Sequence, residues 1–311
     1  MRTLITGSVA YDTIMVFPDR FKNHLLADQL HILNVCFLTP EMRREYGGCA
    51  ANIAYNLQLL GGEPMIMATV GEDIDPYLTR LSGLGLSDRY LRRISGQFTA
   101  QAFITTDLDN NQIIAFHPGA MNFSHENRID ASLGVQLAII APDGKEGMLQ
   151  HARECAAAAI PFIFDPGQGL PMFSADELSE FVKLADYVAV NDYEGKLLEE
   201  KTGRSLEEIS RSVKALVLTL GEKGSLMMAD GRRHEIPSVK AAEILDPTGC
   251  GDAYRAGLLY GIANDWDWPS AGRLGALAGS IKIERRGAQN HHFTKQEIMD
   301  RFRKEFGYSP W

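Results

Sequence analysis

Long apolar runs are missing from this sequence of 311 residues. None approaches the roughly 18 residues that a helix needs to cross a bilayer, and the stretch 155–164 is among the longest. The segment before Asp12 also lacks the apolar core of a secretory signal. We therefore expect no membrane partner and a cytoplasmic location.

Cysteine and basic charge are also in short supply. The four cysteines lie far apart, and no Cys-x-x-Cys pair is present that could bind zinc or perform redox chemistry. Lysine and arginine together number 31 against 40 acidic residues, which gives a net charge of −9. A protein that follows nucleic-acid phosphates normally has a basic excess, so we expect no nucleic-acid partner.

Apolar residues make up 45% of the chain and charged residues 23%, as in ordinary globular proteins. Apolar stretches with strand character alternate with stretches of helical periodicity, and no flexible linker divides them. This pattern predicts an α/β fold, a largely parallel sheet covered by helices on both faces, in a single domain over 1–311. The expected strands are 4–9, 65–70, 136–141, 161–165, 187–190 and 215–220, and the expected helices are one beginning at Gly48 and 76–84, 147–159, 178–184, 193–201, 251–263, 270–284 and 294–305.

Two stretches interrupt this alternation, at about 13–46 and 97–118. The first is rich in apolar residues but has no long helical pattern, and the second has the pattern of a hairpin, with strands at 98–106 and 113–116. Ligands of open α/β folds bind beyond the carboxyl ends of the strands. We therefore expect the two insertions to form a small sheet that acts as a lid over that edge.

The strongest chemical signal is the glycine-rich segment 246–252, Asp-Pro-Thr-Gly-Cys-Gly-Asp, which opens an apolar helix. Backbone N–H groups at such a helix start form a positive concavity that binds an oxyanion. Asp252 lies in the first turn, where a carboxylate either stabilises the helix dipole or accepts a proton from a substrate hydroxyl. The segment is not a P-loop, and Tyr254 stands where a Gly-x-Gly-x-x-Gly signature needs its third glycine.

This segment resembles the C-terminal signature of the ribokinase-type (PfkB) carbohydrate and nucleoside kinases. Four other short motifs resemble signatures of the same family and occur in the family's order, which makes the set specific although each motif is common. They are Gly7 to Asp12, Gly47-Gly48 with Asn52, Asn191 with Glu194, and Thr219 with Gly221 and Gly224, and the segment 286–289 also resembles the family. The resemblance implies a ribokinase-like three-layer αβα fold with a mostly parallel central sheet and a small β-sheet lid.

The resemblance also implies that the chain is an ATP-dependent kinase and assigns the catalytic residues. Asp252 is expected to take the proton from the substrate hydroxyl. The amides of Gly249, Cys250 and Gly251 are expected to hold the γ-phosphoryl oxygens as charge develops on them. Cys250 stands where the family usually has alanine, and a small side chain serves because only the amide is used; a reactive thiol is the alternative.

The remaining motifs are expected to bind the two substrates and the cations. The ATP site would comprise Asn191, Glu194, Thr219, Gly221 and Gly224, with Glu194 holding Mg²⁺ through water. The residues alone also allow Glu194 to be an ordinary solvated side chain, and 219–224 to be a tight turn between strands.

The sugar hydroxyls are expected to contact Asp12, Gly48 and Asn52, because a carboxylate and an amide each form several hydrogen bonds to a cis-diol. In this family a monovalent cation such as K⁺ often binds near the segment 285–287, and the resemblance implies Asp246 and Thr248 as its ligands here. Pro247 departs from the usual threonine. The kinase prediction depends on Asp252 lying beside Asp12, which is some 240 residues earlier in the chain.

The substrate is expected to be a ribonucleoside, adenosine first, phosphorylated at its 5′-hydroxyl. The segments 246–257, 106–113 and 164–168 resemble prokaryotic nucleoside and adenosine kinases more than plain sugar kinases. A sugar kinase acting on ribose, fructose or a sugar phosphate is the alternative, and a non-catalytic nucleotide-binding relative is a second one. We expect a monomer or homodimer. Four phenylalanines of the insertions would either cover a purine or form the lid's own core: Phe17, Phe37, Phe103 and Phe116.

Overall fold

A central sheet organises the structure, a computed structural model that describes residues 1–25, 34–109 and 111–311. Its strands are β1 Arg2–Thr6, β4 Glu63–Val70, β5 Tyr90–Arg93, β8 Leu137–Ile140, β9 Phe162–Phe164, β10 Tyr187–Asn191, β11 Ala215–Thr219, β12 Ser225–Ala229 and β13 Arg232–Ile236. They follow the order β13-β12-β11-β10-β9-β8-β1-β4-β5. The strands from β11 through to β5 run parallel, whereas β12 and β13 add to one edge in antiparallel pairing.

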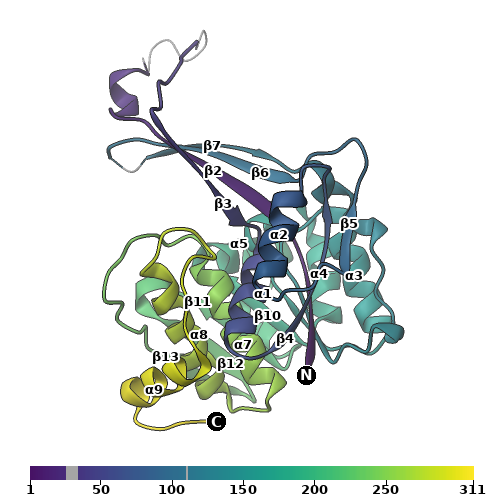
Figure 1. Ribbon diagram of the computed structural model, residues 1–311. Helices are drawn as coiled ribbons and strands as arrows, with labels where there is room; N and C mark the ends of the chain where they lie inside the picture. The colour runs from purple at the N-terminus through teal and green to yellow at the C-terminus, as the bar shows by residue number, and fades with distance from the viewer. Residues whose placement is uncertain (26–33, 110) are drawn as a thin grey trace.

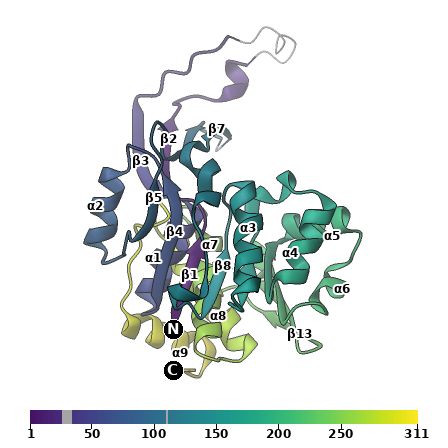
Figure 2. The same cartoon turned by 90° about the vertical axis from the view of Figure 1, so that its right-hand side faces the viewer.

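Helices cover both faces of this sheet, as Figure 2 shows. One face carries α1 Cys49–Leu59, α2 Asp75–Gly83, α7 Cys250–Ala263, α8 Trp268–Ile283 and α9 Lys295–Phe306, and the other carries α3 Lys145–Ala157, α4 Ala175–Leu184, α5 Asp192–Thr202 and α6 Leu206–Ser210. Successive strand residues point to opposite faces, so Ile139 of β8 belongs to one buried core and Ile140 to the other. The predicted three-layer α/β fold is confirmed.

The described residues also include short 3-10 helices, and several of them connect strands to helices. They are η1 Phe21–Asn23, η3 Gly119–Glu126, η4 Ala131–Leu133, η5 Gly167–Met172 and η6 Gly221–Lys223. None of the helices in the described ranges is both long and apolar enough to span a membrane.

Helix α7 is held against α8 by small residues. A Cβ atom on Gly257 would lie only 2.6 Å from the Cα of Gly275, and Gly261 faces Ala271 at similarly close range. The two backbones are therefore in direct contact, and any larger residue would push them apart. This packing fixes the start of α7, which carries Asp252, relative to the central sheet.

A second, smaller sheet projects from the central one, at the top of Figure 1. It has the strand order β3-β2-β6-β7, with bounds β2 Ala10–Val16, β3 Glu41–Gly47, β6 Ala100–Thr106 and β7 Gln112–His117. Strand β2 is parallel to β6 and antiparallel to β3, and β6 and β7 form the expected hairpin. Both insertions seen in the sequence contribute to this sheet.

The expected single strand over 4–9 is wrong, because two strands occupy this part of the chain. Strand β1 ends at Thr6, and β2 begins at Ala10 in the other sheet. Between them the Ser8 N–H donates to the Pro142 carbonyl at 3.0 Å, and a Cβ on Gly7 would lie 3.1 Å from that of Ala141. The apolar run is continuous, but the chain leaves the central sheet inside it.

The phenylalanines of the insertions divide into two groups. Phe17 and Phe37 pack together with Phe21, with ring centroids 4.8 to 5.8 Å apart, and therefore form a small core at the tip of the insertion. Phe103 and Phe116 lie in β6 and β7 and are exposed. The strand register decides which face each of these two occupies, as described below.

Candidate active site

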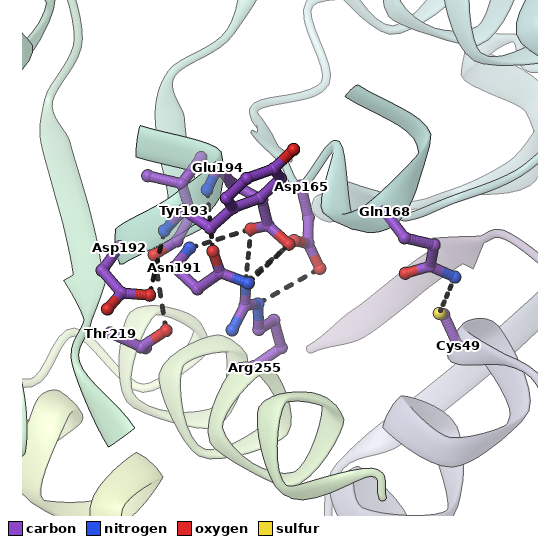
Figure 3. Close-up of polar contacts among 10 residues, drawn as sticks. Cys49, Asp165, Gln168, Asn191, Asp192, Tyr193, Glu194, Thr219 and Arg255 are labelled. Carbon is purple, nitrogen blue, oxygen red and sulfur yellow. Dashed lines mark hydrogen bonds and ion pairs between the residues drawn. The ribbon is translucent and has the colours of Figure 1, made fainter. Parts of the chain in front are cut away.

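Polar residues gather at the carboxyl edge of the central sheet. Asp165 follows β9, Asn191 ends β10 and Thr219 ends β11, and the last two are paired in register. Figure 3 shows these residues together with Arg255 of α7. Because parallel strands end at the same edge, the fold brings together motifs that are far apart in the sequence.

Asp252 lies in the first turn of α7, where it is held by a neighbouring helix. The Asn52 side-chain amide of α1 donates to Asp252 Oδ2 at 2.9 Å. Burial raises the pKa of Asp252 to about 6, although the hydrogen bond from Asn52 opposes that shift. A carboxylate with this pKa is ionised at neutral pH and is basic enough to accept a proton from a hydroxyl group as it reacts.

Asp12 of β2 lies close to Asp252. Burial raises the pKa of Asp12 to about 6, and the second contribution is repulsion from the Asp252 carboxylate. Such repulsion requires the two charges to be near one another. The structure thus brings together the two acidic residues whose proximity the sequence analysis required, one from the small sheet and one from α7.

A buried hydrogen-bond network supports Asn52 from behind. The Gln289 side-chain amide donates to Asn52 Oδ1 at 2.9 Å and to the Tyr77 hydroxyl at 2.7 Å, and Tyr77 donates to the Gly47 carbonyl at 2.8 Å. No role of Gln289 is predicted from the sequence. Its signal is the segment 286–289, whose side chains the sequence alone could not place beside α1.

The paired glycines before α1 permit a close approach of three segments. Gly48 has φ +91°, and a Cβ there would lie 2.5 to 2.7 Å from the backbone of Ser8, Val9 and Ala10. A Cβ on Gly47 would collide with the Asp12 carboxylate. Gly48 therefore brings the start of α1, which carries Asn52, close to the start of β2, which carries Asp12.

The glycine turn at the start of α7 is similarly constrained. Gly249 has φ +80°, and a Cβ there would lie 2.8 Å from that of Ala288. The Cys250 amide donates to the Pro247 carbonyl at 3.1 Å, so a phosphoryl oxygen would have to compete with this bond. Gly251 has only an Arg255 guanidinium nitrogen near its missing Cβ, at 3.5 Å, and faces open space.

The surroundings of Cys250 do not favour a reactive thiol. Burial raises the pKa of Cys250 to about 11, so the thiol stays protonated at neutral pH and the thiolate is scarce. All four cysteines of the chain are free. The interpretation of Cys250 as a small residue with a useful amide is therefore the one that its surroundings favour.

Asn191 and Glu194 form a capping box at the start of α5. The Glu194 amide donates to Asn191 Oδ1, and the Glu194 carboxylate accepts from both the backbone and the side-chain amide of Asn191, each at 2.8 Å. Glu194 is only 8% exposed, so the alternative of an ordinary solvated residue is wrong. Burial raises the pKa of Glu194, and the charge of Asp165 adds to the shift.

Arg255 joins this box to α7. It forms two hydrogen bonds to the Asp165 carboxylate, at 3.0 and 3.2 Å, and lies 4.0 Å from Glu194 Oε2. Both side chains of the Arg255–Asp165 pair are buried. Figure 3 shows the pair beside Glu194. Arg255 belongs to the segment 246–257 that resembles nucleoside kinases, and it links the helix that carries Asp252 to the ends of β9 and β10.

The residues of the expected ATP site at 219–224 differ in how closely neighbouring atoms surround them. Gly224 has φ +87°, and a Cβ there would collide with the Ile236 carbonyl, so the tight turn between β11 and β12 explains this glycine. A Cβ on Gly221 would have no atom within 4 Å. The Thr219 hydroxyl lies 3.4 Å from the Val190 carbonyl. A role of Thr219 and Gly221 in binding ATP stays a prediction.

Comparison with known proteins identifies the family of this chain. The model of the pfkB family carbohydrate kinases matches residues 8–295. The chain belongs to the pfkB family. It is 31% identical over 273 residues to the nucleoside kinase of Methanocaldococcus jannaschii, covering 87% of this chain and 90% of that one.

Solved structures of the family have the same fold as this chain. The nucleoside kinase of Burkholderia thailandensis in complex with inosine is 53% identical, with a TM-score of 0.90 over 99% of both chains. The structure of the same kinase in complex with ADP-inosine has a TM-score of 0.87 over 99% of this chain and 97% of that one. The resemblance inferred from the motifs is confirmed, and the chain is an ATP-dependent kinase of the pfkB family.

Magnesium is compatible with the residues of this pfkB kinase only through indirect contacts. Within the described ranges no three His, Cys, Asp or Glu side chains gather as a metal site. The Glu194 oxygens already accept from Asn191 but retain lone pairs for water, and Mg²⁺ commonly keeps several waters and binds to substrate phosphates. A water-mediated contact with Glu194 therefore fits.

At the segment expected to bind a monovalent cation, the structure places the side chain of a lysine. The Asp246 carboxylate accepts from the Thr248 and Gly287 amides, each at 2.9 Å. The Asp246 carbonyl accepts from the ammonium group of Lys282 at 2.8 Å. A side-chain cation therefore lies at the Asp246 carbonyl, beside one of the two residues that the family resemblance implies as K⁺ ligands, and the expectation of a bound K⁺ with Asp246 and Thr248 as ligands does not fit this chain.

Proposed function

We propose that this kinase transfers the γ-phosphoryl group of ATP to the 5′-hydroxyl of a purine ribonucleoside, adenosine first, in the cytoplasm. The nearness of Asp12, on the small sheet, to Asp252, at the start of α7, carries the proposal. The 31% identical relative from Methanocaldococcus jannaschii is a nucleoside kinase. Inosine, which the Burkholderia thailandensis relative binds, is the second acceptor that we propose.

The face of the small sheet that carries Asp12 supports a nucleoside rather than a bare sugar. Residues paired across neighbouring strands project to the same face, and Asp12 pairs with Ala102, which pairs with Phe116. In the next row of that face stand isoleucines 14, 104 and 114. An apolar surface therefore adjoins the carboxylate, and such a surface suits the flat face of a purine.

The same register removes Phe103 from this role. Phe103 pairs with Thr13, and alternation along a strand puts it on the face opposite Asp12. Phe17 and Phe37 belong to the core at the tip of the insertion. Of the four phenylalanines that the sequence analysis considered, Phe116 is the one we propose to contact the base.

The ribose would be bound by Asp12, with support from the start of α1. The Asp12 carboxylate accepts two or more hydrogen bonds from a cis-diol. Asn52 already donates to Asp252 and accepts from Gln289, which leaves one N–H for the sugar. We therefore give Asn52 two functions: it contacts the sugar, and it orients the carboxylate of Asp252, the proposed general base.

In the proposed reaction the Asp252 carboxylate takes the proton of the 5′-hydroxyl as the oxygen attacks the γ-phosphorus. The bond from that phosphorus to the bridging oxygen breaks, and ADP leaves with the electron pair. The amides of Gly249, Cys250 and Gly251 and the N-terminus of α7 stabilise the charge on the phosphoryl oxygens. Mg²⁺, when bound, neutralises phosphate charge, with Glu194 orienting its waters. The small sheet would exclude water, which competes as acceptor.

The experiment that tests this function is a comparison of acceptors at fixed ATP and Mg²⁺. ADP formation is measured with adenosine, inosine, cytidine, ribose and fructose 6-phosphate, and phosphorus NMR locates the new phosphate. We expect kcat/KM for adenosine and inosine to exceed that for ribose at least 10²-fold. A preference for ribose or the hexose phosphate would make the chain a sugar kinase, and no turnover with any acceptor would make it a silent relative.

A further inference from the structure

Lys282 of α8 is a lysine with its side chain fully buried. Its ammonium group donates to two backbone carbonyls, that of Asp246 at 2.8 Å and that of Arg285 at 3.1 Å. Lysine is among the residues least often buried, because its charge must be compensated. Here the compensation comes from carbonyl dipoles, the same ligands that hold a monovalent cation in proteins.

The charges that face Lys282 come from several elements. Burial lowers the pKa of Lys282, whereas the carboxylates of Asp246, Asp252 and, from β3, Glu45 oppose that shift. Asp246 precedes the glycine turn, and Asp252 follows it. The ammonium group thus lies among acidic groups that belong to, or border, the proposed phosphoryl site.

Lys282 lies directly behind the glycine turn. A Cβ on Gly249 would be 3.7 Å from the Lys282 Cε atom. By binding the carbonyls of Asp246 and Arg285, the ammonium group joins the segment before the turn to the segment after α8. The Asp246 carboxylate makes a second link between the same two segments through the amide of Gly287.

We propose that Lys282 is a built-in substitute for a monovalent cation: it positions the turn 246–251 and holds a fixed positive charge behind its amides, so that phosphoryl transfer needs no K⁺. The inference rests on the proposed function of this turn. A K⁺ ion at the same carbonyls would meet the ammonium group at contact distance, and two like charges so close repel strongly when buried. A fixed charge also adds to the electrostatic stabilisation of a phosphoryl group.

The first test measures the wild-type kinase with adenosine, ATP and Mg²⁺ in a buffer whose monovalent cation is tetramethylammonium, and again with 100 mM K⁺ or Na⁺. We expect kcat to change less than about twofold, since a tethered cation is always present. A rise of tenfold or more with K⁺ would overturn the inference and leave the nucleoside kinase function intact. No turnover with any acceptor in any salt would instead reject the proposed function.

The second test replaces the tethered cation with a free one. Lys282→Ala should lose about 10²-fold in kcat in tetramethylammonium, and K⁺ or NH₄⁺ should restore at least tenfold, because the deletion leaves space at the two carbonyls. Its melting temperature should rise with K⁺, whereas that of the wild type should not. Lys282→Met fills the space without charge and should be inactive in every salt. Full activity of Lys282→Met would overturn the inference.

A matched control exists on α5. Lys201 also donates to two backbone carbonyls, those of Pro171 at 2.8 Å and Phe173 at 2.6 Å, and lies near the end of its helix. Lys201→Ala should lower the melting temperature without making stability or kcat depend on K⁺. The same K⁺ dependence in both variants would show a general effect of lost lysine contacts and overturn the inference. If Lys282→Ala does not fold, the wild-type measurement still decides.

Discussion

Asn52 and Asp252, 200 residues apart in the chain, share a hydrogen bond of 2.9 Å between the side-chain amide and carboxylate Oδ2. The bond stabilises the ionised form of the carboxylate and opposes the rise in the pKa of Asp252 that burial causes. It therefore connects the first turn of α1 with the motif that opens α7, and it lowers the pH at which the carboxylate of Asp252, the proposed general base, becomes ionised.

Asn52→Ala should shift the pH dependence of the reaction. Without the amide, the pKa of Asp252 rises above about 6, so the carboxylate loses its proton only at higher pH. A hydrogen bond to a charged group contributes about 1.5–3 kcal/mol, and the acid limb of the kcat profile should move up by about one pH unit or more. Asn56→Ala is the control on the same helix, since Asn56 binds His291 and not Asp252; an equal shift there would contradict the assignment.

Asp252→Asn should separate binding from chemistry. The amide keeps the size of the side chain but cannot accept the hydroxyl proton, so we expect kcat to fall by about 10²-fold or more. Binding of adenosine, measured by calorimetry, should remain within a few fold of the wild type. A variant with nearly wild-type turnover would remove Asp252 from its role as base.

Burial of the Asp12 and Asp252 carboxylates, together with repulsion of Asp12 by Asp252, predicts an increase in stability when the charge of Asp252 is removed. Both pKa values are raised to about 6, so the folded state favours the protonated forms, and this contribution to stability is lost as the pH rises through about 6. Asp252→Asn should therefore melt about 2–4 °C above the wild type at pH 8, with a smaller gain at pH 5. An equal gain at both values would point to a cause other than charge.

Much of the fold could be predicted because both faces of the central sheet are buried. Its strands are short apolar runs and its helices have one apolar side. Two of the central strands that escaped prediction are at the edges, where polar residues replace the apolar run: β5 contains Arg92 and Arg93, and β13 begins Arg232-Arg233. A paired edge strand of this kind has no distinctive hydrophobic pattern. Strand β12 also escaped, although it is apolar and lies inside the sheet.

Some residues of the site could be predicted from the sequence and others could not. The motifs identified Asp252, Asp12 and Asn52 because their residue types and order resemble a family. The supporting residues could not be found, since Gln289 and Lys282 acquire their roles from contacts with segments 237 and 36 residues away. Phe103 and Phe116 have the same chemistry, and only the register of β6 with β2 and β7 separates them.

Removing the buried ion pair between Arg255 and Asp165 should destabilise the protein strongly. Arg255→Met leaves the Asp165 carboxylate buried without its partner, which typically costs about 3–5 kcal/mol of unfolding free energy, measured by urea denaturation. The matched control is Arg153→Met, since Arg153 also makes two hydrogen bonds to one carboxylate, that of Glu180, on the surface. There we expect a loss of no more than about 1 kcal/mol. Similar losses in the two variants would contradict the importance of burial.

The two phenylalanines of the small sheet offer a test of how the base is bound. Phe116 is on the face that carries Asp12, and Phe103 is on the opposite face of the adjoining strand; both are exposed. If the base lies against the Asp12 face, Phe116→Ala removes part of its apolar contact and should raise KM for adenosine by about tenfold, because an aromatic contact contributes about 1–3 kcal/mol per base. Turnover with ribose, which has no base, should be unchanged. Phe103→Ala should leave both substrates unaffected, and an equal loss in the two variants would indicate that the sheet responds as a whole rather than through one face.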